Sequence, residues 1–335
     1  MKIIVDAMGG DNAPYEIVAG ALAAQRDTGA DILLVGKTEE ILRSFEAMGI
    51  SDLPRGIEIH NAEGSIDMED DPVSAIRTKR DSSMVVALNL LHDGAGDALV
   101  SAGSTGALLT GATVIVKRVR GIRRAALAPF VPSKSGGFLM IDCGANAECT
   151  PEYLLQFAYM GAYYVENTLG VKNPRVALLN NGTEPHKGTA LQIETHALLS
   201  APECQLNFVG NLEGSGALNG GCDVLVCDGF SGNIMLKTIE GAAKFIMSEL
   251  KPVFKKNILT YFAAALVRGG LNNLKQTLNP DRVGGTAMLG IAKPVIKAHG
   301  SSGAAAITAA IGQAIRAAET NIAEKLHENV GAMKI

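Results

Sequence analysis

The chain has 335 residues, which is long enough for one large α/β domain or for two smaller ones. Apolar residues make up 47% and charged residues 19%, a balance that is typical of a globular protein with a buried core and excludes extensive disorder. The net charge of −4 excludes a general nucleic-acid-binding role, because such proteins neutralise phosphates with clustered lysines and arginines.

The five cysteines stand at irregular spacing and form no C-x-x-C pair. This usage is typical of reduced, buried thiols in a cytosolic protein. Clustered cysteine and histidine spacing is absent, so we expect no metal site. The chain opens with the strand-like run Lys2–Asp6, which predicts a cytoplasmic location without a signal peptide.

Short apolar runs of strand length alternate with helix-length patterns along the chain. We predict strands at Ile3–Asp6, Ile32–Val35, Ile57–His60, Ala98–Ser101, Leu127–Val131, Phe138–Asp142, Val176–Leu179, Leu206–Val209 and Val224–Cys227. Helical patterns lie between most of them, for instance at Pro72–Leu91, Pro151–Leu169 and Lys187–Leu199. The alternation predicts a mainly parallel sheet covered by helices on both faces.

The stretch Ala98–Val116 contains no charge and approaches the length of a membrane span. Gly103, Gly106 and Gly111 interrupt it, so a buried strand, a turn and a helix are the better interpretation. We find no internal repeat and no low-complexity linker. We therefore expect residues 1–335 to form a single catalytic α/β unit.

Polar, glycine-rich turns follow many of the predicted strands. They are Asp6–Asn12, Ser101–Gly106, Asp142–Asn146, Asn180–Thr189 and Asp228–Asn233, with a similar turn at His299–Gly303. Because ligands of parallel α/β sheets bind at the carboxyl ends of the strands, we expect these turns at one sheet edge. Such turns expose N–H groups at helix starts and suit phosphate or another anion. Taken alone, each turn is explained by a tight strand-to-helix connection with a capping side chain.

Four common catalytic motifs are absent. The sequence has no G-x-x-x-x-G-K-[ST], no G-x-G-x-x-G after a strand, no G-x-S-x-G and no H-E-x-x-H. These absences argue against a P-loop ATPase, the usual dinucleotide site and an α/β-hydrolase. They favour chemistry in which a bound anion attacks, without a protein nucleophile or a metal.

Five segments, in order along essentially the whole chain, carry a resemblance to a known family. They are Asp6–Asp11, Val100–Ala107, Asp142–Asn146, Cys227–Asn233 and Ala298–Ser302. In combination they resemble the PlsX family, the phosphate acyltransferases of bacterial phospholipid synthesis. One departure lies at Asn181–Thr189, where the family has a more acidic run before the Lys-Gly step.

The resemblance implies a homodimeric, Rossmann-like three-layer α/β/α sandwich, related to phosphotransacetylases and the isocitrate dehydrogenase-like group. It implies transfer of a fatty acyl group from acyl carrier protein to inorganic phosphate, without a cofactor. The acyl phosphate would then pass to a membrane-bound glycerol-3-phosphate acyltransferase.

The resemblance also implies roles for individual residues. Lys187 would supply positive charge to the phosphate or the developing oxyanion, and Asn233 would hydrogen-bond the thioester carbonyl. The structural alternative for Lys187 is an exposed lysine at a helix start, and the alternative for Asn233 is a simple helix cap. The candidate phosphate-binding residues are Ser101, Gly103, Ser104 and Thr105, with His299 and Ser301 as further members of the same crevice.

Residues 251–280 contain five basic side chains and no acidic one. Four apolar residues fall on one helical face, and basic residues flank them: Ile258, Leu259, Phe262 and Leu266, with Lys255, Lys256 and Arg268. The uncharged part is too short to span a bilayer. Three interpretations stay open: contact with an anionic membrane, contact with the acidic carrier protein, or packing of a dimer.

Three other functions compete with this interpretation. A phosphotransacetylase-like enzyme would use acyl-CoA in place of the carrier protein. An NAD-dependent decarboxylating dehydrogenase would use a related fold. A membrane scaffold without catalytic activity would not need the polar strand-end residues.

Overall fold

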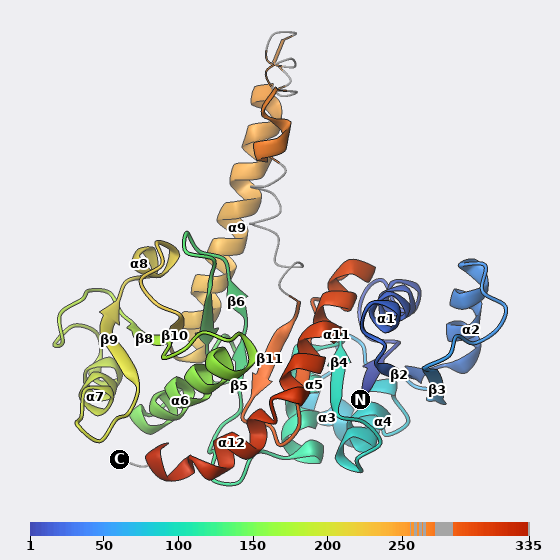
Figure 1. Ribbon diagram of the computed structural model, residues 1–335, viewed down its shortest axis with the longest axis horizontal. Helices are drawn as coiled ribbons and strands as arrows, with labels where there is room; N and C mark the ends of the chain where they lie inside the picture. Colours follow the sequence, from blue (N-terminus) through green and yellow to red (C-terminus); the bar gives the residue numbers. More distant parts are fainter. Residues whose placement is uncertain (255, 258–259, 261–262, 264–265, 272–283, 334–335) are drawn as a thin grey trace.

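The computed structural model describes residues 1–254, 256–257, 260, 263, 266–271 and 284–333. Its strands form two sheets that lie side by side, each between helices (Figure 1). The prediction of an α/β fold with mainly parallel strands is confirmed. The expectation of one shared sheet edge is wrong, because the strands that precede the polar turns divide between the two sheets.

The first sheet combines N-terminal strands with two strands from the end of the chain. Its order is β3 (Ile57–Asn61), β2 (Asp31–Gly36), β1 (Lys2–Asp6), β4 (Ala98–Ser101), β12 (Val295–Lys297), β11 (Thr286–Leu289) and β5 (Ala126–Ala128). The pairs from β3 to β12 are parallel, and β11 runs antiparallel to both of its neighbours. The two late strands, which the sequence analysis did not predict, lie between β4 and β5.

The second sheet is formed by the middle of the chain. Its order is β6 (Phe130–Val131), β7 (Phe138–Ile141), β10 (Val224–Val226), β8 (Arg175–Leu179) and β9 (Asn207–Leu212). All pairs except β6–β7 are parallel. Pro129 separates β5 from β6 and has no N–H to donate to a ladder. The predicted strand Leu127–Val131 is therefore two strands, one in each sheet.

Helices cover both faces of each sheet. On the first sheet, α1 (Tyr15–Thr28) and α11 (Ala304–Glu319) pack on one face, and α4 (Ser83–His92) packs against β1, β2 and β4. On the second, α6 (Pro151–Thr168) packs against β7, β8 and β10. The remaining elements are α2 (Thr38–Ala47), α3 (Pro72–Thr78), α5 (Thr105–Gly111), η1 (Ala112–Val116), α7 (Ala190–Leu199), α8 (Gly214–Leu218), α9 (Gly229–Phe254), α12 (Ile322–Glu328) and η3 (Val330–Met333).

One apolar core joins the two sheets. Buried side chains of β1 and β4, such as Ile3 and Val100, belong to the same cluster as Leu139 of β7 and Val224 of β10. Separate clusters fill the outer faces of the first and second sheets. This shared core supports a single catalytic unit, which stays a prediction.

Two predicted helices differ from those observed. Pro72–Leu91 contains two helices, because the chain leaves the helical conformation at Lys79 and Ser82 then caps α4 by accepting a bond from Val85 N. The pattern Lys187–Leu199 becomes helical only at Ala190, after a capping box at Thr189. Lys187 therefore lies in a loop.

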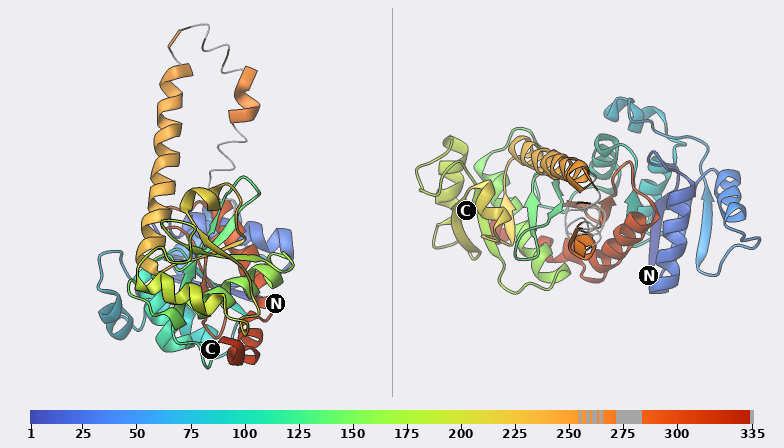
Figure 2. Two further views of the ribbon diagram at one scale, coloured as in Figure 1. Left: turned by 90° about the vertical axis from the view of Figure 1, so that its left-hand side faces the viewer. Right: turned by 90° about the horizontal axis from the view of Figure 1, so that it is seen from above.

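Helix α9 projects from the body of the molecule (Figures 1 and 2). Its 26 residues span about 39 Å at the usual rise per residue. Several of its large apolar side chains are exposed, among them Phe230, Phe245 and Val253. No helix in the described part of the chain is long and apolar enough to cross a membrane.

Candidate active site

Three polar residues form a row across the end of the first sheet. Asp6 of β1 is in register with Ser101 of β4, and Ser101 is in register with Lys297 of β12. Register partners on parallel strands point to the same face, at a strand spacing of about 4.8 Å. All three residues are buried. We call them the strand-end row.

Asp6 binds groups that are far from it in the sequence. Ser83 Oγ donates to Asp6 Oδ1 and Ser101 Oγ donates to Asp6 Oδ2, both at 2.6 Å. Burial raises the pKa of the Asp6 carboxyl above its usual value, although these hydrogen bonds and the nearby Lys297 charge act in the opposite direction. The carboxyl thus links α4 to the turn after β4.

The turn after β4 is held from both sides. Gly103 N donates to Ser101 Oγ at 3.1 Å, and Lys297 Nζ donates to Ala102 O at 3.2 Å. Lys297 Nζ also donates to Ala298 O. Burial lowers the pKa of Lys297 to about 8, against the opposing charges of Asp6 and Asp11.

Backbones from three turns meet above the strand-end row. A Cβ on Gly9 would lie 2.7 Å from both Asp6 Oδ2 and Gly103 N, so only glycine fits there. Asp11 N donates to Gly300 O at 2.8 Å. The turns that follow β1, β4 and β12 are therefore in direct contact, as the positions of the polar motifs predicted for these three.

A cavity of about 290 Å³ opens beside these turns. Its lining comes from the turns after β1 and β4 and from the loop before α3: Met8, Gly10, Asp11, Ser65, Ile66, Asp67, Met68, Glu69 and Gly103. Three of these side chains are carboxylates. An anion that binds here requires cationic groups nearby to offset their repulsion.

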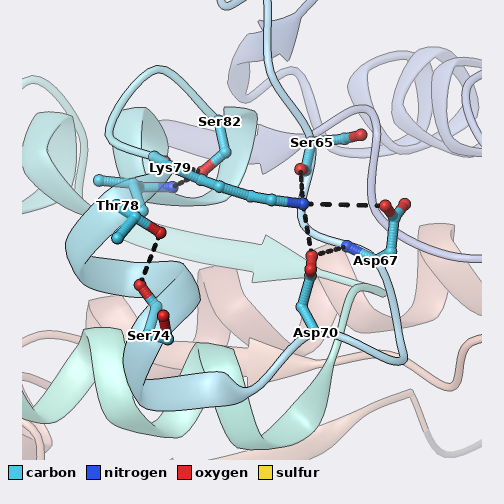
Figure 3. A network of polar contacts seen from close by, with 8 residues as sticks. Ser65, Asp67, Asp70, Ser74, Thr78, Lys79 and Ser82 are labelled. Atoms are coloured by element: carbon cyan, nitrogen blue, oxygen red, sulfur yellow. Dashed lines mark hydrogen bonds and ion pairs between the residues drawn. The ribbon is translucent and has the colours of Figure 1, made fainter.

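Lys79 binds the loop 65–70, which we call the outer wall of the cavity because residues 65–69 line it. Figure 3 shows the polar contacts of Lys79. Its Nζ donates to Asp70 Oδ2 at 2.6 Å and to Ser65 O at 3.3 Å, and lies 3.8 Å from Asp67 Oδ2. These bonds draw the loop 65–70 toward the end of α3. Hydrogen bonding to Lys79 lowers the pKa of Asp70.

The predicted phosphate-binding residues lie around the same turns, and they differ in what their side chains do. Ser101 and Ser104 are buried, and Ser104 Oγ caps α5 by accepting a bond from Ala107 N at 3.5 Å. Thr105 is half-buried at the start of α5. His299 and Ser301 are exposed and bonded to each other, with 2.9 Å between His299 Nδ1 and Ser301 Oγ. Gly103 lines the cavity.

A second buried aspartate organises the end of the second sheet. Asp142 follows β7 and accepts bonds from Leu127 N, Ala145 N, Asn146 N and Asn146 Nδ2, at 2.7 to 3.2 Å. Burial raises the pKa of the Asp142 carboxyl against these bonds. Three of its four donors are backbone groups, so Asp142 fixes the path of its own turn.

The start of α9 packs tightly on this turn. A Cβ on Gly232 would lie 2.0 Å from Asp142 O, and a Cβ on Gly229 would lie 2.6 Å from Asn146 O. The glycines of Asp228–Asn233 thus allow the helix to begin against the β7 turn. Asn233 is exposed and lies over Gly144, where a Cβ would be 3.7 Å from Asn233 Cγ.

Lys187 is exposed in the loop between β8 and α7. Asn180 Nδ2 donates to Lys187 O at 3.0 Å, and Lys187 N donates to Glu184 O at 3.1 Å. The backbone at Lys187 is therefore fixed while its ammonium remains open to solvent. Its side chain runs past Gly182, where a Cβ would lie 3.0 Å from Lys187 Cγ.

The two strand-end regions are linked through β5. Ile296 of β12 is in register with Ala287 of β11, which is in register with Ala128 of β5. Two strand spacings correspond to about 10 Å. Leu127 N, next to Ala128, donates to Asp142 Oδ1 at 2.9 Å. The Asp142 turn is thus connected through β5 to the strands of the first sheet.

The predicted contact segment is only partly described. Lys256, Leu266 and Arg268 are exposed, and Leu266 is 89% exposed. Lys255, Ile258, Leu259 and Phe262 lie outside the described residues. In the ranges that the structure describes, no group of three or more His, Cys, Asp or Glu residues could hold a metal ion.

Sequence reasoning missed Lys297 and Ser83. Lys297 directly precedes the Ala298–Ser302 motif, but the strand that contains it has only three residues. Ser83 lies inside the pattern that was predicted as one long helix, and a serine in such a pattern does not by itself indicate a site residue. The sequence feature that could have indicated Lys297 is its position at the end of the short apolar run Val295–Ile296.

The fold is an α/β architecture of the kind found in phosphotransacetylases. A phosphotransacetylase from Streptococcus pyogenes superposes with a TM-score of 0.62 at 19% identity, covering 96% of this chain and 94% of that one. At this identity, the similarity establishes the fold alone.

Sequence relatives establish the family. A family model described as fatty acid synthesis protein matches residues 1–325. A phosphate acyltransferase of Alkaliphilus oremlandii is 43% identical over 99% of this chain and 98% of its own length. Another, of Bacillus licheniformis, is 43% identical over 98% of both chains. The chain belongs to the PlsX family of phosphate acyltransferases, an acyltransferase family of fatty acid and phospholipid synthesis.

Proposed function

We propose that this enzyme transfers a fatty acyl group from the thioester of acyl carrier protein to inorganic phosphate. The observation that carries the proposal is the family match over residues 1–325, together with relatives that are named phosphate acyltransferases. The acyl phosphate then supplies a membrane-bound glycerol-3-phosphate acyltransferase, and the enzyme works in the cytoplasm as a homodimer.

A thioester is already activated, so the reaction needs no acyl-enzyme intermediate. A phosphate oxygen attacks the thioester carbonyl carbon, and the carbonyl oxygen becomes an oxyanion. The tetrahedral intermediate collapses with loss of the carrier thiolate, which takes up a proton. The enzyme's task is to position the two reactants and to stabilise the oxyanion.

The exposed groups of the second sheet suit the reacting atoms. Asn233 is the fifth residue of α9, and its exposed amide can donate to the thioester carbonyl as negative charge develops. Lys187 supplies a mobile positive charge from a fixed backbone. The turn Ser101–Thr105, with His299 and Ser301 beside it, receives the phosphate.

Carrier protein is the proposed donor because basic residues collect in the segment 251–280, which begins in the last turn of α9. Lys256 and Arg268 are exposed, and the segment 251–280 has no acidic residue. An acidic carrier protein or an anionic membrane surface is attracted by such a segment. Exposed apolar side chains such as Leu266 suit peripheral membrane contact.

The test is incubation with acyl carrier-protein thioester and labelled phosphate, followed by detection of a hydroxylamine-sensitive acyl phosphate. Acyl-CoA serves as the competing donor. We expect carrier-protein thioester to give the higher kcat/KM. A preference for acyl-CoA, or product formation that does not depend on phosphate, would overturn the proposal.

Two variants test the roles of the exposed groups. We expect Lys187→Ala and Asn233→Ala each to lower kcat about 100-fold, the loss typical of one oxyanion donor. Their thermal unfolding stays unchanged because both side chains are exposed. Lys172→Ala is the matched control, since Lys172 is an exposed loop lysine before β8. Near wild-type activity in Lys187→Ala would show that this lysine has no catalytic role.

A further inference from the structure

Lys297 is a buried lysine below the place where three turns meet. It is 7% exposed and ends β12, in register with Ser101 of β4 and Thr286 of β11. Burying an ammonium group removes it from water at considerable cost, so the position requires an explanation. Within the described ranges Lys297 forms no ion pair.

The hydrogen bonds of Lys297 go to backbone carbonyls of two turns. Its Nζ donates to Ala102 O and to Ala298 O. Ala298 N in turn donates to Ser101 O at 2.9 Å. The ammonium therefore ties the turn after β4 to the turn after β12 at the point where both leave the sheet.

The turn that Lys297 holds has little freedom of its own. Gly103 N is bonded to Ser101 Oγ, and Ser101 Oγ is bonded to Asp6 Oδ2. If Ala102 O loses its donor, only the bond from Gly103 N to Ser101 Oγ still orients the peptide between Ala102 and Gly103. Gly103 lines the cavity, so a shift of this peptide changes the cavity wall.

Charge gives Lys297 a second role. Asp11, Asp67 and Glu69 line the cavity, and Asp6 lies buried beneath it. These carboxylates repel a phosphate dianion. Lys297 places a positive charge under the same turns, and Asp6 and Asp11 are the acidic groups that act on it.

We infer that Lys297 is a positioning residue for the phosphate substrate: it shapes the Ala102–Gly103 turn and offsets the acidic lining of the cavity. This inference rests on the proposed function in one respect, namely that phosphate binds at this turn. It assigns Lys297 no contact with the reacting atoms.

The test compares Lys297→Met with the wild-type enzyme. Methionine keeps the length and apolar stem of lysine but has no charge and no donor. We expect KM for phosphate to rise about tenfold or more, the usual effect of losing a charged hydrogen bond, while KM for the acyl donor changes less than about threefold. Lys293→Met is the matched control, because Lys293 precedes the same strand and donates to Gly96 O at its opposite end.

A pH profile tests the inference without relying on that variant to fold. Because burial lowers the pKa of Lys297 to about 8, we expect KM of the wild-type enzyme for phosphate to rise between about pH 8 and pH 9.5. Lys297→Arg keeps its charge over this range, so its KM stays flat. Both results support the inference.

Two results would overturn the inference on Lys297. One is a wild-type KM for phosphate that does not change with pH, and the other is a folded Lys297→Met enzyme with an unchanged KM for phosphate. Failure of the proposed function is recognised separately, because the wild-type enzyme would then form no acyl phosphate from carrier-protein thioester. The Lys297 comparison can still be made with acyl-CoA as donor.

Discussion

Asp6 and Asp142 both end a strand and both are buried, yet they hold different kinds of structure. Asp6 receives hydroxyl groups of Ser83 and Ser101, 77 and 95 residues away. Asp142 receives mainly backbone N–H groups, and three of its four bonds come from the next four residues. The first aspartate connects distant segments, and the second shapes its own loop.

This difference shows how the two sheet ends are suited to separate tasks. Around Asp6, the buried polar groups satisfy one another, and glycine backbones and carboxylates line the cavity above them. Around Asp142, the loop is fixed beneath the exposed Asn233, which lies in α9 over Gly144. Substitutions at the two aspartates should therefore differ in their effect on the free energy of unfolding.

The largest effect on stability is expected at Asp142. Asp142→Ala leaves four donors without their acceptor in a buried loop, so we expect it to lower the free energy of unfolding by about 4 kcal/mol or more. Urea unfolding measures this change. Asp142→Asn keeps one carbonyl oxygen for Leu127 N and Ala145 N, so it should lose about half as much.

Asp6→Asn sharpens the comparison. It keeps an acceptor for one serine, and the serine hydroxyls can reorient, so its loss of stability should be smaller than that of Asp142→Asn. If Asp142→Ala unfolds at the same urea concentration as the wild-type protein, the loop does not depend on this carboxylate. The contrast between the two sheet ends would then be lost.

An effect of intermediate size on the free energy of unfolding is expected from the titration of Lys297. Its folded-state pKa is lowered to about 8, below the usual 10.5 of the unfolded chain. The folded state therefore binds fewer protons than the unfolded state between these values, and the contribution of Lys297 to stability is fully present only above pH 10.5. It is lost as the pH falls through 8. Between about pH 8 and pH 9.5 the contribution changes by about 1.5 kcal/mol.

Comparison with Lys297→Met isolates this contribution. Other groups that titrate at alkaline pH, such as cysteines and tyrosines, are common to both proteins. We expect the stability of the wild-type protein to increase relative to the variant as the pH rises through this range. A constant difference between the two unfolding curves would mean that Lys297 titrates normally and that burial does not govern it.

The fold class could be predicted because the strands β1, β2, β4 and β8 are short apolar runs between helical patterns. The division into two sheets could not. Residues 126–131 are one apolar run, and only the pairing of β5 with β11 and of β6 with β7 assigns them to different sheets. Such pairing depends on contacts between residues distant in the sequence.

The candidate site, like the fold, could be predicted only in part from the sequence. The turns after β1, β4 and β12 meet, as the polar motifs at strand ends indicated. The bonding of each side chain was not predictable, since Ser101 and Ser104 point their hydroxyls into the protein. The sequence did not indicate a role for Lys297, because its position below the turns follows from the register of β12 with β4. The roles of Lys187, Asn233 and the phosphate-binding residues stay predictions.

The smallest effect is expected at the cavity's outer wall, which belongs to neither sheet end. Lys79→Met removes the bonds to Ser65 O and Asp70 Oδ2 that draw the loop 65–70 toward α3 (Figure 3). Because exposed ion pairs are weak, we expect unchanged thermal unfolding and a rise of about two- to fivefold in a KM value. Phosphate should be affected more than the acyl donor, since Asp67 and Asp70 lose their compensating charge. Lys2→Met removes a similar surface pair with Glu58 at the start of β1, the end of that strand opposite the cavity, and should leave both KM values unchanged. An equal response of the two lysine variants would mean that the loop 65–70 does not contribute to substrate binding.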